Sequence, residues 1–131
     1  MRSGRAYPAA AGAFLNFRYV TVPRIEFLWW RECPSWERAL ADLRAAMDDR
    51  GLDPAAIELI EIEDEEAARR ERFVGSPTIR VNGADVQPTS ADEPVGLNCR
   101  VYRRRDGRVS PLPDPLDVRT ALAAGEAGGD G

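Results

Sequence analysis

Histidine and lysine are both absent from this sequence, and all 18 of its basic residues are arginines. Without histidine, the chain cannot build a Ser-His or Cys-His catalytic pair, an imidazole metal ligand or a histidine general base. Cysteine is scarce too, because the chain holds only two, and two cannot close a four-thiolate zinc site within one chain. Any catalysis must therefore use Cys33, Cys99, a carboxylate, a tyrosine or an arginine.

Long apolar runs and a strong net charge are also missing. No stretch approaches the roughly 18 apolar residues of a membrane span, and the formal net charge of -4 gives no general attraction to nucleic acid. The apolar part near the start is short and is interrupted by Pro8 and Gly12, which favours a tail over a secretion signal. We therefore expect a cytoplasmic protein with neither a membrane nor a nucleic-acid partner, and we expect no cofactor.

The length of 131 residues suits one domain with its own core. We expect a disordered extension over residues 1–13, a folded domain over residues 14–123 and a disordered tail over residues 124–131. The sequence leaves the oligomeric state open.

Hydrophobic periodicity and turn residues predict the elements of this domain. Short apolar stretches rich in β-branched and aromatic residues indicate strands, and apolar residues at three- and four-residue steps indicate the first helix, which Gly51 ends. The polar loop over residues 83–96 is long for a hairpin connection, so we expect it to cover part of the molecule. The expected strands are residues 14–22, 24–30, 57–62, 78–81 and 99–103, and the expected helices are residues 34–50, 64–73 and 116–124.

From residue 24 onward the order is strand, helix, strand, helix, strand, strand, helix, which describes a small α/β sandwich. Two motifs stand out in this order. Cys33-Pro34 lies between the first core strand and the first helix, and V-G-S-P-T-I-R-V-N-G covers residues 74–83. On these two anchors, residues 24–123 resemble the thioredoxin superfamily, nearest to its small glutaredoxin-like bacterial members. The pair C-P-x-W and G-L-x-C-R-V-Y is also similar to small bacterial proteins described as alkylmercury lyase-like.

The resemblance implies a thioredoxin-like α/β sandwich with a mixed four- or five-stranded sheet flanked by helices. It implies that Cys33 is a reactive thiol and that a cis Ser76-Pro77 turn presents its backbone beside that thiol, where an extended peptide or a γ-glutamyl-type ligand can pair with it. The substrate-binding residues expected on this basis are Pro34, Trp36, Ser76, Pro77 and Thr78.

The sequence departs from the family pattern at two places. Trp36 replaces the second cysteine of Cys-x-x-Cys, so the usual disulfide at that motif cannot form. The stretch A-D-V-Q, residues 84–87, replaces the Gly-Gly-x-Asp of glutaredoxins. We expect Trp36 to pack in the core through the stripe that continues with Leu40 and Leu43, with an aromatic surface for a ligand as the alternative.

The chemistry expected of Cys33 follows from its place before a helix. Unpaired N–H groups and the positive end of the helix dipole favour a thiolate, the nucleophilic form of cysteine. Arg31 can add positive charge, whereas Glu32 and Glu37 act in the opposite sense. We expect Cys33 to attack disulfides and form a mixed disulfide, with a buried packing role as the alternative.

Cys99 shares strand parity with Val101, so we expect a buried structural cysteine at the end of the sheet away from Cys33. A resolving thiol is the first alternative. The second is a soft-metal site in which Asp85 joins the two thiolates. The arginine cluster over residues 100–105 is expected to be a solvated strand face, with phosphate or acidic-partner binding as the alternative.

Three functions remain open from the sequence. The leading hypothesis is single-cysteine thiol–disulfide exchange, with a protein or small-molecule thiol or disulfide as partner and no resident metal. The second is a non-catalytic thioredoxin-like binding or scaffold module. The third is binding of a soft metal or an organomercurial through Cys33 and Cys99.

Overall fold

A computed structural model describes residues 22–127 of the chain. Its core is a four-stranded mixed sheet in the order β3-β2-β4-β5, which three helices flank. The strands are β2 (Ile25–Trp29), β3 (Glu58–Glu61), β4 (Thr78–Val81) and β5 (Ala84–Asp85). The helices are α1 (Trp36–Asp49), α2 (Glu65–Glu71) and α3 (Pro115–Glu126). The predicted mixed α/β architecture is thereby confirmed at this level. The predicted extension over residues 1–13 and most of the predicted strand over residues 14–22 lie outside the described residues.

The sheet places β2 at its centre. β2 runs parallel to β3 on one side and antiparallel to β4 on the other, and β4 continues into β5 through the turn at Asn82-Gly83. Both turn residues have positive φ, 52° and 85°, as a tight Asn-Gly hairpin turn requires. β3 forms one edge of the sheet, a position that suits the two glutamates in its sequence.

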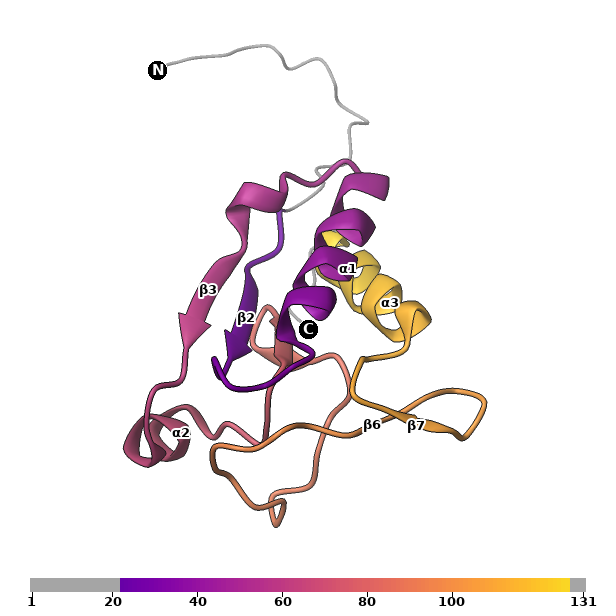
Figure 1. Cartoon of the computed structure of the whole chain (residues 1–131). Helices are drawn as coiled ribbons and strands as arrows, with labels where there is room; N and C mark the ends of the chain where they lie inside the picture. The colour runs from indigo at the N-terminus through magenta and orange to yellow at the C-terminus, as the bar shows by residue number, and fades with distance from the viewer. Residues whose placement is uncertain (1–21, 128–131) are drawn as a thin grey trace, which may run out of the picture.

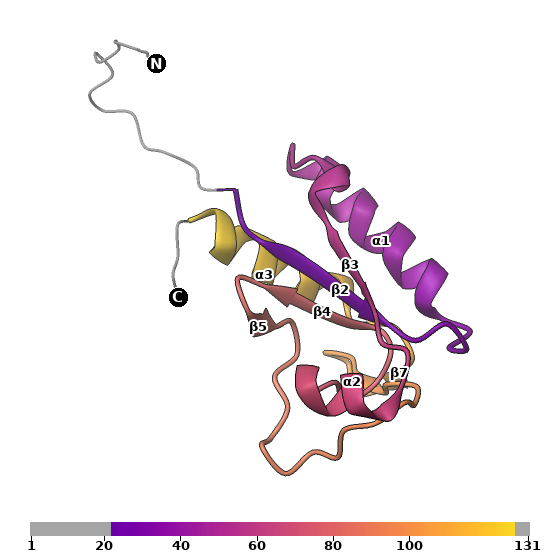
Figure 2. The same cartoon turned by 90° about the vertical axis from the view of Figure 1, so that its left-hand side faces the viewer.

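Alternate residues of β2 serve two apolar clusters. Ile25 and Phe27 face the larger cluster, in which α1 and α3 pack side by side on one face of the sheet (Figure 1). Leu28 faces a smaller cluster built with the short helix α2 and Phe73. Figure 2 shows the four strands in order and α2 below them, near the end of β2 that leads into α1. This end of the sheet carries the site described below.

The helices form where the sequence signals place them, with differences of two or three residues at some ends, such as α2, which ends at Glu71 rather than at residue 73. α1 buries the predicted stripe that includes Leu40, Leu43 and Met47, and Gly51 follows it with a φ of 74°. The helix begins at Trp36 rather than at Pro34, because Ser35 takes the N-cap position. α3 runs to Glu126, so the folded part extends beyond the predicted boundary at residue 123.

The predicted strand over residues 99–103 is wrong in its pairing. Only β6 (Tyr102–Arg103) is a strand, and it pairs with β7 (Val109–Ser110) in a separate hairpin. The fourth strand of the main sheet is β5, which the sequence analysis had placed in a loop. None of the helices within residues 22–127 combines the length and the apolar character needed to cross a membrane.

Candidate functional site

Cys33 lies in the turn between β2 and α1, where its backbone N–H donates to the carbonyl of Trp30 at 3.0 Å. Its residue is only 2% exposed, and its thiol donates a hydrogen bond to the backbone oxygen of Ser76 at 3.4 Å. The expected position facing the Ser76-Pro77 turn is therefore confirmed, but the expected open thiol is wrong. Arg31, which was expected to add charge there, forms an ion pair with Glu61 at 2.8 Å.

The Ser76-Pro77 turn contains the predicted cis peptide bond. Ser76, Pro77 and Thr78 are all buried. The Ser76 hydroxyl accepts a hydrogen bond from the backbone of Trp30 at 3.0 Å, and the Thr78 hydroxyl donates to the carbonyl of Gly75 at 2.7 Å. These bonds tie the turn to the end of β2, directly beside Cys33.

The backbone of this turn is already paired with another part of the chain. Ser76 donates its N–H to the carbonyl of Asn98 at 2.9 Å and accepts from the N–H of Arg100 at 2.8 Å. These bonds form an isolated parallel bridge between Ser76 and Cys99. The backbone groups that were expected to receive an extended substrate are thus occupied by the protein's own residues 98–100.

Cys99 is exposed and lies next to Cys33, so its predicted burial at the opposite end of the sheet is wrong. Both cysteines are free thiols. Partial desolvation raises the pKa of Cys99, and the neighbouring Cys33 raises that pKa further. The Cys33 thiol donates to the carbonyl of Ser76 and the backbone of Cys99 pairs with the same residue, so the two cysteines lie on either side of Ser76 and form one site.

Gly75 permits the close approach of residues 98–100, which the sequence analysis did not foresee. Its φ is 147°, which side-chain-bearing residues rarely adopt. A Cβ at this position would lie 2.7 Å from the side-chain oxygen of Asn98 and 2.9 Å from the Cα of Arg100. The glycine of the G-S-P-T motif was the sequence signal for this contact, because another backbone segment can pack this closely only against a residue without a side chain.

Arg100 anchors the segment that carries Cys99. Its side chain is 4% exposed and donates to both carboxylate oxygens of Asp85, at 2.8 and 3.0 Å. It also donates to the carbonyl of Gln87 at 2.7 Å and to the hydroxyl of Thr78 at 3.2 Å. The expectation of a solvated arginine face is therefore wrong for Arg100, although Arg103 and Arg105 of the same cluster are exposed.

The ring of Tyr102 also holds the guanidinium of Arg100, which lies over its face. The centre of its ring lies 4.3 Å from the guanidinium carbon of Arg100, and its hydroxyl donates to the carbonyl of Pro77 at 2.6 Å. Burial raises the pKa of Tyr102 far above its usual range, although Arg100 acts to lower it. Burial acts to lower the pKa of Arg100, but Tyr102 and Asp85 raise it overall, so Arg100 stays charged.

The remaining predicted site residues have mixed outcomes. Trp36 stacks on Trp29 with the ring centres 4.1 Å apart, and both pack against the larger apolar cluster, so the core role of Trp36 is confirmed. Pro34 is exposed. Asp85 is engaged by Arg100, and the described residues contain no group of three or more Cys, Asp or Glu side chains that could hold a metal ion. The three-ligand metal site of Cys33, Cys99 and Asp85 is therefore wrong.

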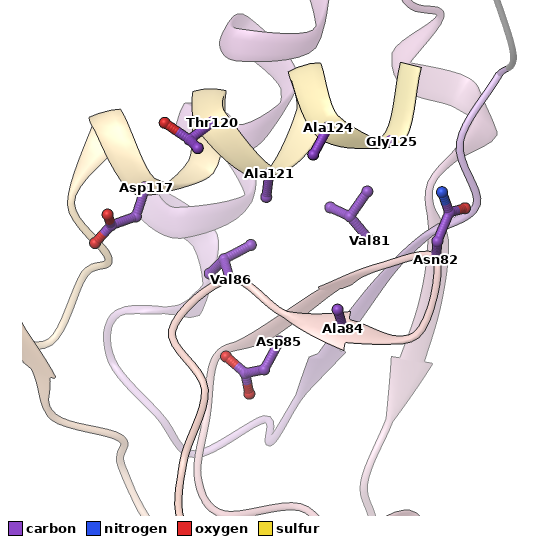
Figure 3. Close-up of a pocket in the computed structure, with 10 residues that line it drawn as sticks. All are labelled: Val81, Asn82, Ala84, Asp85, Val86, Asp117, Thr120, Ala121, Ala124 and Gly125. Atoms are coloured by element: carbon purple, nitrogen blue, oxygen red, sulfur yellow. The ribbon is translucent and has the colours of Figure 1, made fainter. Parts of the chain in front are cut away.

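Two hollows bear on the choice of a site. A polar one of about 410 Å³ is lined by Cys99, Asn98, Glu93 and residues 87–90, and Cys33 is not part of its lining. The other, of about 340 Å³, lies between the β4–β5 hairpin and α3 (Figure 3). Its lining is mainly apolar and contains neither cysteine. Of these two hollows, the one beside Cys99 has a cysteine in its lining and can admit a reactant to that thiol.

Comparison with protein-family models, with curated proteins and with solved structures gives no match to this chain.

Proposed function

We propose that this protein carries out thiol–disulfide exchange through Cys33 and Cys99 on a thioredoxin-like fold. The observation that carries the proposal is the meeting of Cys33 and Cys99 at Ser76, although the two cysteines are far apart in the sequence. The fold assignment is supported by the thiol directly after β2 and by the Ser76-Pro77 turn that precedes β4 beside it. A reversible thiol pair suits a reducing compartment, in keeping with a cytoplasmic location.

The pair changes the chemistry expected from Cys33 alone. A single thiol that forms a mixed disulfide depends on an outside thiol to release it. Here the second thiol is within the same site, so a mixed disulfide on either cysteine can be displaced by the other. The product is an internal Cys33–Cys99 disulfide, which takes the place of the Cys-x-x-Cys disulfide that Trp36 excludes.

Thiol counting tests this proposal because the chain has only two cysteines. Reduced protein is incubated with a tenfold excess of a small disulfide such as cystamine and then denatured, and its free thiols and mass are measured. We expect the wild type to lose both thiols and two mass units without an adduct. Cys33→Ser and Cys99→Ser each have one thiol and should at most gain an adduct. Two free thiols or a double adduct in the wild type would refute the proposal.

A second candidate function is binding of a soft metal ion or an organomercurial as cargo. The adjacency of Cys33 and Cys99 favours it, because two thiolates can hold a soft ion in two-coordinate geometry. Titration of the reduced protein with Cu(I) in the presence of a competing chelator tests it. Stoichiometric binding that both single serine variants abolish would support this function, and equal binding by wild type and variants would exclude it. A protein inert in both assays would match the scaffold module instead.

A further inference from the structure

We infer that Cys99, and not Cys33, is the sulfur that receives the substrate, and that Cys33 is the resolving thiol. This inference rests on the proposed exchange function and assigns the order of its steps. It reverses the roles expected from the sequence, where the cysteine before the first helix was the one to attack.

Access to the two sulfurs carries the assignment. Cys33 is 2% exposed, and the turn that it faces is covered by residues 98–100 through the two backbone hydrogen bonds to Ser76. A disulfide substrate cannot reach Cys33 while these bonds and the buried Arg100 anchor hold. Cys99 belongs to the covering segment itself and is exposed. The chain therefore presents one sulfur to solvent and keeps the other directly behind it.

The hollow beside Cys99 supplies the approach path. Its volume of about 410 Å³ lies within the range of small-molecule sites. Its walls are residues 87–90 and Glu93 from the long loop, together with Asn98. Most of these side chains are polar, so a small polar disulfide, or an exposed disulfide on a polar loop, matches the surroundings of Cys99.

The exchange balances with no further reactant. The Cys99 thiolate attacks one sulfur of R–S–S–R, the Cys99–S–S–R bond forms, and the first RS⁻ leaves and takes up a proton. Cys33 then gives up its hydrogen bond to Ser76 and attacks the sulfur of Cys99 as a thiolate. The Cys99–R disulfide breaks, and the second RS⁻ leaves with the proton that Cys33 released. The protein loses two electrons, and R–S–S–R gains two and becomes 2 RSH.

Adduct kinetics on the two single variants test the order. Cys33→Ser and Cys99→Ser are each mixed with cystamine, quenched with acid over time and weighed by mass spectrometry. Each rate is divided by the rate of the same variant in 8 M urea, which removes differences in intrinsic reactivity. We expect the native Cys33→Ser to form its adduct at least tenfold faster than the native Cys99→Ser on this normalised scale. Equal rates, or a faster Cys99→Ser, would overturn the inference.

A second measurement uses the wild type, so its result does not depend on whether the serine variants fold. Reduced protein is labelled briefly with a limiting amount of iodoacetamide and then digested with trypsin. Trypsin cuts after arginine and places the two cysteines in separate peptides, Cys33 in residues 32–38 and Cys99 in residues 81–100. We expect label on Cys99 before Cys33, and early label on Cys33 would overturn the inference. If Cys33 is labelled first but the internal disulfide still forms, the assigned order of attack is wrong and the proposed exchange function stands. If no internal disulfide forms, the order of attack and the exchange function are both refuted.

Discussion

Replacing Asp85 with asparagine removes the charge that faces the buried guanidinium of Arg100. The Arg100 side chain is 4% exposed and the Asp85 side chain 17%, and both carboxylate oxygens are used. Removing one partner of a buried ion pair costs about 3–5 kcal/mol, because the other charge remains buried without compensation. The asparagine oxygen still accepts one hydrogen bond, and the bonds of Arg100 to Gln87 and Thr78 stay. We therefore expect a loss of about 3 kcal/mol in the free energy of unfolding.

Urea denaturation followed by tryptophan fluorescence measures this loss. With a urea slope of about 1–3 kcal/mol per M, the midpoint should fall by at least about 1 M. Asp42→Asn is the matched control, since Asp42 pairs with Arg38 on the exposed face of α1. An exposed pair contributes about 0.5 kcal/mol or less, so the control should barely move. A loss below about 1 kcal/mol in Asp85→Asn, or equal losses in both variants, would refute the ion-pair anchor.

Three further predictions concern the thiol site. Gly75→Ala should slow formation of the internal disulfide by more than tenfold, because a Cβ there meets the Cα of Arg100 at 2.9 Å and displaces the segment that carries Cys99. A time course of thiol counting measures this rate, and an unchanged rate would contradict the prediction. In the wild type, alkylation of Cys99 should rise with pH around a midpoint above that of an ordinary cysteine thiol, because the pKa of Cys99 is raised. In Cys33→Ser that midpoint should fall, because the neighbouring thiol that contributes to the raised pKa is gone, and an unchanged midpoint would show that Cys33 does not contribute to it. Cystamine, a cation, should react faster than the anionic 3,3′-dithiodipropionate, because Glu93 lines the hollow and the charge of Arg100, which also lines it, is paired with Asp85. Glu93→Gln should reduce this difference in rate, and equal rates in the wild type would contradict the prediction.

The sequence predicts well those parts of the fold that local signals determine. The apolar stripe of α1 and the glycine that ends this helix have short-range causes, and the structure confirms both of them. The start of α1 was predicted two residues early, because a proline such as Pro34 fits both the first turn of a helix and the turn before its N-cap. The position of Cys33 facing the Ser76-Pro77 turn came from the family resemblance and agrees with the structure.

The position of Cys99 could not be predicted from strand parity. Parity applies to a continuous strand, whereas Cys99 lies in an irregular segment whose strand-type pairing is one isolated bridge to Ser76. The burial of Arg100 has a similar origin, because its partner Asp85 belongs to a strand that the sequence showed only as loop. Both errors arise from long-range contacts that the periodicity of a single segment does not contain.

The central claim is that Cys33 and Cys99 form one redox pair, and peptide mapping of the oxidised protein tests it most directly. The protein is oxidised, its remaining thiols are blocked, and it is digested with trypsin without reduction. We predict one species in which residues 32–38 and 81–100 are joined by a disulfide, and which reduction separates into the two peptides. Recovery of the two peptides unlinked, each carrying the blocking group or an adduct of the oxidant, would contradict the claim.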